Sequence, residues 1–91
     1  MITVVEKQVV WLVSNIYTNQ HTSTGRVETT IYGKEQDAVA EFSRRIREGL
    51  PRDTPTLVLE HEIELGLANS CYQLDCDEDI CVVCIDKDVV N

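Results

Sequence analysis

The four cysteines are the residues whose type and spacing most readily suggest chemistry. Cys71, Cys76, Cys81 and Cys84 form the pattern C-x4-C-x4-C-x2-C, a ligand set that zinc accepts. They lie among strand formers, so we expect a hairpin with Cys76 and Cys81 on its core face and the other two cysteines on the opposite face. Sulfurs divided between two faces cannot meet at one tetrahedral ion. We therefore expect structural thiols and no metal or cofactor, with a zinc site and a Cys76–Cys81 cross-strand disulfide as the alternatives.

The other reactive residue types do not form a catalytic pattern. The chain has two histidines, His21 in a polar loop and His61 in a segment of alternating hydrophobicity. No glycine-rich turn provides an oxyanion hole or a phosphate-binding loop. The acids near the end of the chain resemble the start of a calcium loop, but Ile80 stands where that loop needs glycine. We expect a protein that is not an enzyme.

Charge is distributed unequally along the chain, whose net charge is −8. Residues 1–50 carry six acids and six bases, whereas residues 51–91 carry ten acids and two bases. The second half therefore carries all of the excess negative charge. A negative field repels nucleic acid and acidic membranes and attracts basic protein surfaces. We expect a partner protein with a basic surface, and neither direct nucleic-acid binding nor membrane binding.

Length and hydropathy indicate a small soluble domain. With 91 residues, 43% of them hydrophobic, the chain can build one modest core, so we expect a single domain over residues 1–91. The longest apolar run, residues 9–13, is too short to cross a bilayer, and the Glu6-Lys7 pair before it does not fit a signal peptide. We expect a cytoplasmic protein whose cysteines stay mostly reduced.

The first half of the chain is predicted to form a β-hairpin and a helix. Residues 8–17 are mostly β-branched or aromatic, which suits a central strand, and residues 26–32 alternate as its hairpin partner. Between Gly33 and Gly49, apolar residues recur at spacings of three and four, which predicts a helix with one buried face.

The second half is predicted to add three strands. Residues 56–65 alternate between mostly aliphatic and mostly acidic side chains, which is typical of a strand with a core face and an acidic face. Residues 71–76 and 80–86 are predicted to form the final hairpin. The expected fold is α+β with element order ββαβββ: a five-stranded antiparallel sheet of strand order 2-1-3-4-5, with one helix packed on one face. A single helix leaves the other face open.

The open face is the predicted binding site. If the third and fourth strands pair with their core faces aligned, Glu62 opposes Asp75 and carboxylates of neighbouring strands lie side by side. Trp11 and Tyr17 are expected on the same face as interface anchors, unless the two faces of the first strand are reversed. The predicted partner-binding residues are Trp11, Tyr17, Glu60, Glu62, Glu64, Asp75, Asp77, Glu78 and Asp79.

In size, charge and absence of a catalytic motif, the chain resembles small acidic phage-encoded inhibitor proteins of the anti-CRISPR kind. The resemblance implies a nucleic-acid mimic that blocks a nucleic-acid-handling complex, such as a CRISPR effector, in the host cytoplasm. We predict a non-enzymatic acidic protein-binding module. The alternatives are a homodimer or larger homo-oligomer that uses Trp11 and Tyr17 in a self-complementary contact, a small zinc or redox protein that uses the C-terminal cysteines, and a solvated acidic face without a partner.

Overall fold

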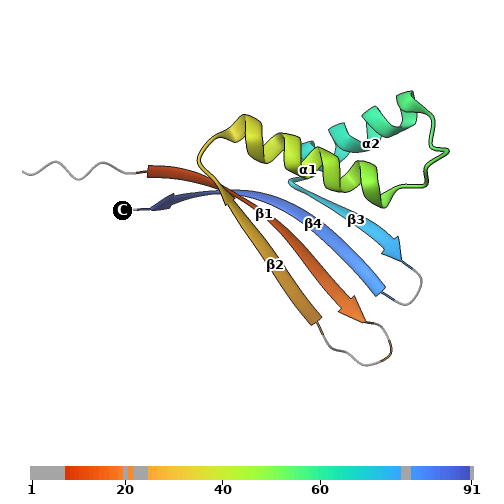
Figure 1. The fold of residues 1–91 in the computed structure, drawn as a ribbon, viewed down its shortest axis with the longest axis horizontal. Coiled ribbons are helices and arrows are strands. Elements are labelled where there is room, and N and C mark those ends of the chain that lie inside the picture. The colour runs from red at the N-terminus through yellow and green to blue at the C-terminus, as the bar shows by residue number, and fades with distance from the viewer. Residues whose placement is uncertain (1–7, 20, 22–24, 77–78, 91) are drawn as a thin grey trace, which may run out of the picture.

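A four-stranded antiparallel sheet with two helices on one face is formed by the residues that the computed structural model describes, which are 8–19, 21, 25–76 and 79–90 (Figure 1). The elements in chain order are β1 (Gln8–Asn19), β2 (Gly25–Tyr32), α1 (Glu35–Gly49), α2 (Thr56–Asn69), β3 (Cys71–Cys76) and β4 (Asp79–Val90). The predicted α+β class and antiparallel pairing are confirmed, whereas the predicted five strands and single helix are wrong.

The sheet has the strand order β2-β1-β4-β3. β1 and β4 pair over their whole lengths, from Gln8 opposite Val90 to Asn19 opposite Asp79. The central position predicted for the first strand is therefore correct, and its continuous β-branched character suits a strand with neighbours on both sides. The predicted order 2-1-3-4-5 is wrong, because the last strand of the chain occupies the place beside β1 that was expected for residues 56–65.

Residues 56–65 belong to helix α2 and not to a strand. Leucine and glutamate, which dominate this segment, are good helix formers. Pro55 stands at the N-cap, and its carbonyl accepts a 2.9 Å hydrogen bond from the Leu59 amide in the first turn. The apolar side chains of α2 are distributed around most of the helix. The alternation in its sequence therefore does not correspond to the two faces of a strand. The alternation is equally compatible with a helix of weak amphipathicity.

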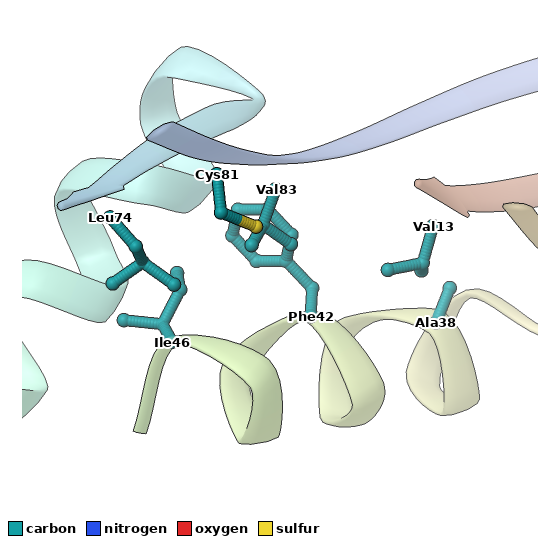
Figure 2. Close-up of a cluster of buried hydrophobic side chains, with 7 residues drawn as sticks. All are labelled: Val13, Ala38, Phe42, Ile46, Leu74, Cys81 and Val83. Atoms are coloured by element: carbon teal, nitrogen blue, oxygen red, sulfur yellow. The ribbon is translucent and has the colours of Figure 1, made fainter. Parts of the chain in front are cut away.

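The hydrophobic core lies between α1 and the two central strands (Figure 2). Phe42 and Ile46 of α1 and Val13 and Val83 of the sheet are fully buried. Ala38 also contributes from α1, and Leu74 and Cys81 complete the cluster. The helical spacing therefore predicted the burial of Phe42 and Ile46 correctly, whereas Val39 of the predicted stripe is only partly buried. Helix α2 packs beside α1 and against β3, where Ile63 and Leu67 extend the core.

The two faces of β1 are reversed relative to the prediction. Val13 is fully buried beneath α1, and Trp11 and Tyr17, which share its parity, lie on the helix-covered side. Leu12 and Ile16 lie on the opposite side. Both sets of side chains on this strand are largely apolar, so period-two alternation could not decide which set is inside.

The final hairpin forms as predicted, but its register differs by two residues from the expected one, in which Leu74 pairs with Val83. Leu74 lies opposite Cys81, and Cys76 lies opposite Asp79 at the hairpin end. The core face was assigned correctly, since Leu74 and Cys81 are both buried. The ladder does not place Cys76 opposite Cys81, so the cross-strand pairing on which the alternative of a Cys76–Cys81 disulfide was based is wrong. The acidic tip at residues 77–78 lies outside the described residues.

Candidate functional site

The described residues do not form the predicted row of carboxylates on one sheet face. Glu60, Glu62 and Glu64 lie on α2, and Asp75 lies on the sheet face that the helices leave uncovered. Glu62 is half-buried and accepts a 2.7 Å hydrogen bond from the Tyr72 hydroxyl group. It therefore ties α2 to β3 and does not oppose Asp75.

Of the remaining predicted acids, only Asp79 is among the described residues. Asp79 begins β4, and its Cα partner in β1 is Asn19. Asp77 and Glu78 lie outside the described residues. The carboxylates of the C-terminal half are thus divided between a helix and the far side of the sheet.

Trp11 lies in a shallow hollow at the start of α1 and not on the open face. A hollow of about 720 Å³ is lined by Trp11, Lys34, Glu35 and Val39, among other residues, and is open to solvent. Its charged side chains are of both signs. Among the described residues, no cluster of three or more His, Cys, Asp or Glu side chains could hold a metal ion.

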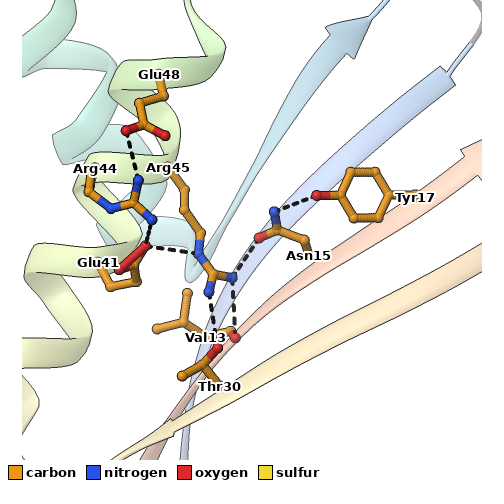
Figure 3. A network of polar contacts seen from close by, with 8 residues as sticks. All are labelled: Val13, Asn15, Tyr17, Thr30, Glu41, Arg44, Arg45 and Glu48. Carbon is orange, nitrogen blue, oxygen red and sulfur yellow. Dashed lines mark hydrogen bonds and ion pairs between the residues drawn. The ribbon is translucent and has the colours of Figure 1, made fainter.

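Tyr17 belongs to a polar network that joins α1 to the sheet (Figure 3). Its hydroxyl oxygen accepts a 2.9 Å hydrogen bond from Asn15 Nδ2, and Asn15 Oδ1 accepts a 2.7 Å bond from Arg45. The guanidinium of Arg26 lies 4.6 Å from the centroid of the Tyr17 ring, a cation–π contact. Tyr17 therefore has an intramolecular role and does not anchor the open face.

Arg45 is the centre of this network. It donates hydrogen bonds to Thr30 Oγ1 at 3.2 Å, to Glu41 at 3.2 Å and to the Val13 carbonyl at 3.4 Å. The pKa of Glu41 is lowered, first by the hydrogen bond from Arg44 and then by that from Arg45, although burial opposes the shift. The polar side chains on the helix-covered side of β1 and β2 thus hold α1 in place.

Neither of the two described helices lies on the sheet face opposite to them, as Figure 1 shows. Leu12 lies opposite Ile31, and Ile16 lies between Val27 of β2 and Val82 of β4. The exposed fractions are 63% for Val27, 66% for Ile31 and 37% for Ile16. We call this surface the open-face patch; it consists of Leu12, Ile16, Val27, Ile31, Ile80 and Val82.

The charge around the open-face patch has one sign. Asp75, Asp86 and Asp88 lie on this face, next to the patch in β3 and β4, and all three are exposed. No lysine or arginine of the four strands, as far as they are described, lies on this side. Arg26 and Lys87 are on the helix-covered side, and the other described bases are on α1 or in the segments that flank it. The described charges on the open sheet face are therefore all acidic, whereas the helix-covered side carries both acids and bases.

Sequence reasoning missed Val27 and Ile31 as surface residues. They alternate along β2 with Arg26, Glu28, Thr30 and Tyr32, a pattern that by itself favours burial of the aliphatic set. The polar set faces the helices instead, because Arg45 bonds to Thr30 there. That contact joins residues far apart in the sequence, so a local sequence pattern does not predict it.

No protein-family model, curated protein or solved structure matches this chain. In the part of the chain that the structure describes, neither helix is long and apolar enough to cross a membrane.

Proposed function

We propose that this chain is a non-enzymatic protein-binding module whose open face docks on a protein surface that is apolar at its centre and carries lysine and arginine around it. The observation that supports this proposal is the exposure of Val27 and Ile31, at 63% and 66%, on a sheet face that neither described helix covers. The Ser14–Thr29 hydrogen-bonded pair lies between the rows that hold Val27 and Ile31. Exposed aliphatic side chains grouped on one face in this way often mark an interaction site.

The open face is large enough for a specific interface. β1 and β4 have 12 residues each, β2 has 8 and β3 has 6. A rise of about 3.4 Å per residue and a strand spacing of about 4.8 Å give a projected area of roughly 600 Å². A standard interface buries about 800 Å² of accessible surface on each partner, and accessible surface exceeds projected area.

Charge favours a basic partner over a second copy of the chain. Two copies docked through this face would bring Asp75, Asp86 and Asp88 of each copy toward the same carboxylates of the other, without a described base to offset them. A partner with bases around its apolar centre would pair with these aspartates. Such electrostatic complementarity raises the association rate and excludes like-charged partners.

The proposal keeps the predicted acidic binding module and changes its site. Trp11, Tyr17 and Glu62 are replaced as binding residues by the open-face patch and its three aspartates. Action as a nucleic-acid mimic of the anti-CRISPR kind and a cytoplasmic location stay predictions. The described residues do not form the carboxylate row that motivated the mimic, so the remaining support for a mimic is the net charge of −8.

Site-specific photo-cross-linking tests the proposal. A benzophenone amino acid replaces Ile31 in one variant and Leu57, which is 81% exposed on the outer side of α2, in a matched variant. Both are irradiated in an extract of the cells that make the protein, at low and high salt. We expect a cross-linked partner from position 31 that disappears at high salt, and no such product from position 57.

Two outcomes would contradict the proposal. Cross-links from position 57 alone would place the interface on the helices. A cross-link between two copies of this chain would show that the open face binds a second copy and not a different protein. Light scattering on the purified protein would also detect such a homodimer.

A further inference from the structure

We propose that Cys71 and Cys84 form a reversible disulfide between β3 and β4, and that this pair is an oxidative modification site on the open face. The two residues are direct partners in the β3–β4 ladder. Their side chains point away from the helices, because the neighbouring residues Tyr72 and Val83 point toward them. The proposal does not depend on the partner proposed above.

The ladder places Cys71 and Cys84 in the pairing type with the closest side chains. The Ile85 amide donates a 3.0 Å hydrogen bond to the Ser70 carbonyl, so Ser70 and Ile85 form a hydrogen-bonded pair. Such pairs alternate with non-hydrogen-bonded pairs along an antiparallel ladder, so the next pair, Cys71 with Cys84, is of the second type. The Cα atoms of such pairs are about 4.5 Å apart, and disulfides span Cα separations of about 4.4–6.8 Å.

The surroundings give the two thiols different roles. Cys71 is exposed, so a soluble oxidant can reach it, whereas Cys84 is half-buried between β1 and β3. Burial, and after it the neighbouring Cys71 and Asp86, raise the pKa of the Cys84 thiol. Cys71 is therefore the site of first attack, and Cys84 reacts second from within the sheet. Cys81 is buried on the other face of β4 and faces the core.

The chemistry is thiol–disulfide exchange with a small soluble disulfide such as oxidised glutathione. The Cys71 thiolate attacks one sulfur of the oxidant, which forms a mixed disulfide and releases one glutathione thiolate. Cys84 then loses its proton to solvent and attacks Cys71 Sγ, which releases the second glutathione. The two cysteines lose two electrons and two protons in total, and one glutathione disulfide becomes two glutathione thiols.

Mass spectrometry of the purified chain in defined glutathione redox buffers tests this site. After the remaining thiols are alkylated in denaturant, which exposes the buried Cys81, the wild type should carry two labels in place of four and no glutathione. Peptide mapping should place the bond between Cys71 and Cys84. The Cys84→Ser variant should keep one glutathione on Cys71, because the second step is removed. The Cys71→Ser variant should gain glutathione several-fold more slowly.

Several results would overturn the assignment. These are a disulfide mapped to another pair, wild-type protein that keeps glutathione at equilibrium, and a bond between two copies of the chain. Circular dichroism confirms that each serine variant is folded before it is scored. The Cys81→Ala variant serves as the control, since it should form the Cys71–Cys84 bond like the wild type.

Discussion

Gly66 of α2 lies directly against the ring of Phe42 of α1. A Cβ atom at position 66 would lie 3.1 Å from Cε1 of Phe42 and 2.9 Å from Cδ1 of Ile46. We expect Gly66→Ala to lower the free energy of unfolding by about 1 kcal/mol, because overpacking costs about 1–3 kcal/mol and outweighs a helix-propensity gain of about 1 kcal/mol. Urea denaturation followed by far-ultraviolet circular dichroism measures the change.

Gly33→Ala is the matched control for this substitution. No atom lies within 4 Å of a Cβ placed at position 33, so the alanine variant should unfold at nearly the wild-type urea concentration. A Gly66→Ala variant as stable as Gly33→Ala would show that the two helices are not packed as closely as described.

Arg45 should stabilise the fold more than its neighbour Arg44. Arg45→Met keeps the apolar stem but removes the hydrogen bonds to Asn15 and Thr30, so we expect a loss of about 1–2 kcal/mol in the free energy of unfolding. Arg44 is half-exposed and bonds to Glu41 and Glu48 of its own helix. Arg44→Met should leave the urea midpoint close to that of the wild type. Equal losses for the two variants would contradict the role of the network that joins α1 to the sheet.

Tyr72 should make stability depend on alkaline pH. The pKa of Tyr72 is raised to about 12, first by burial and then by its hydrogen bond to Glu62. The folded state therefore favours the neutral phenol, a contribution that is complete below about pH 10, the pKa of an unfolded tyrosine, and is lost as the pH rises to about 12. The unfolding free energy of the wild type should fall relative to that of Tyr72→Phe across this interval. A difference between the two that stays constant with pH would refute this.

Local sequence patterns predicted a large part of the fold. Residues 8–17 read correctly as a central strand because both of its faces are largely apolar. The recurrence that includes Phe42 and Ile46 identified the buried face of α1. The final hairpin was recognised because strand formers flank a short acidic tip. In each case the sequence pattern that supports the prediction lies within one element or two elements adjacent in the sequence.

The incorrect predictions depend on contacts between distant segments. Residues 56–65 alternate in hydrophobicity like a strand. The local pattern does not show that Gly66 contacts Phe42, a contact that allows α2 to pack closely on α1. The orientation of β1 follows from the bond between Arg45 and Asn15, which are 30 residues apart. Because the faces of β1 were reversed, Trp11 and Tyr17 were assigned to the open face in place of Leu12 and Ile16.

The affinity of paired lysine variants for the cross-linked partner tests the central claim that the open face binds a basic protein. Val27→Lys/Ile31→Lys places two positive charges on the open face, and Leu57→Lys/Val58→Lys places two on the exposed side of α2. Titration calorimetry with the purified partner should show at least a hundredfold loss of affinity, or about 2.7 kcal/mol, for the first variant. The α2 variant should bind within about threefold of the wild type, a difference of about 0.7 kcal/mol, because its charges lie away from the open face. Full binding by the open-face variant, or loss in the α2 variant alone, would contradict the claim.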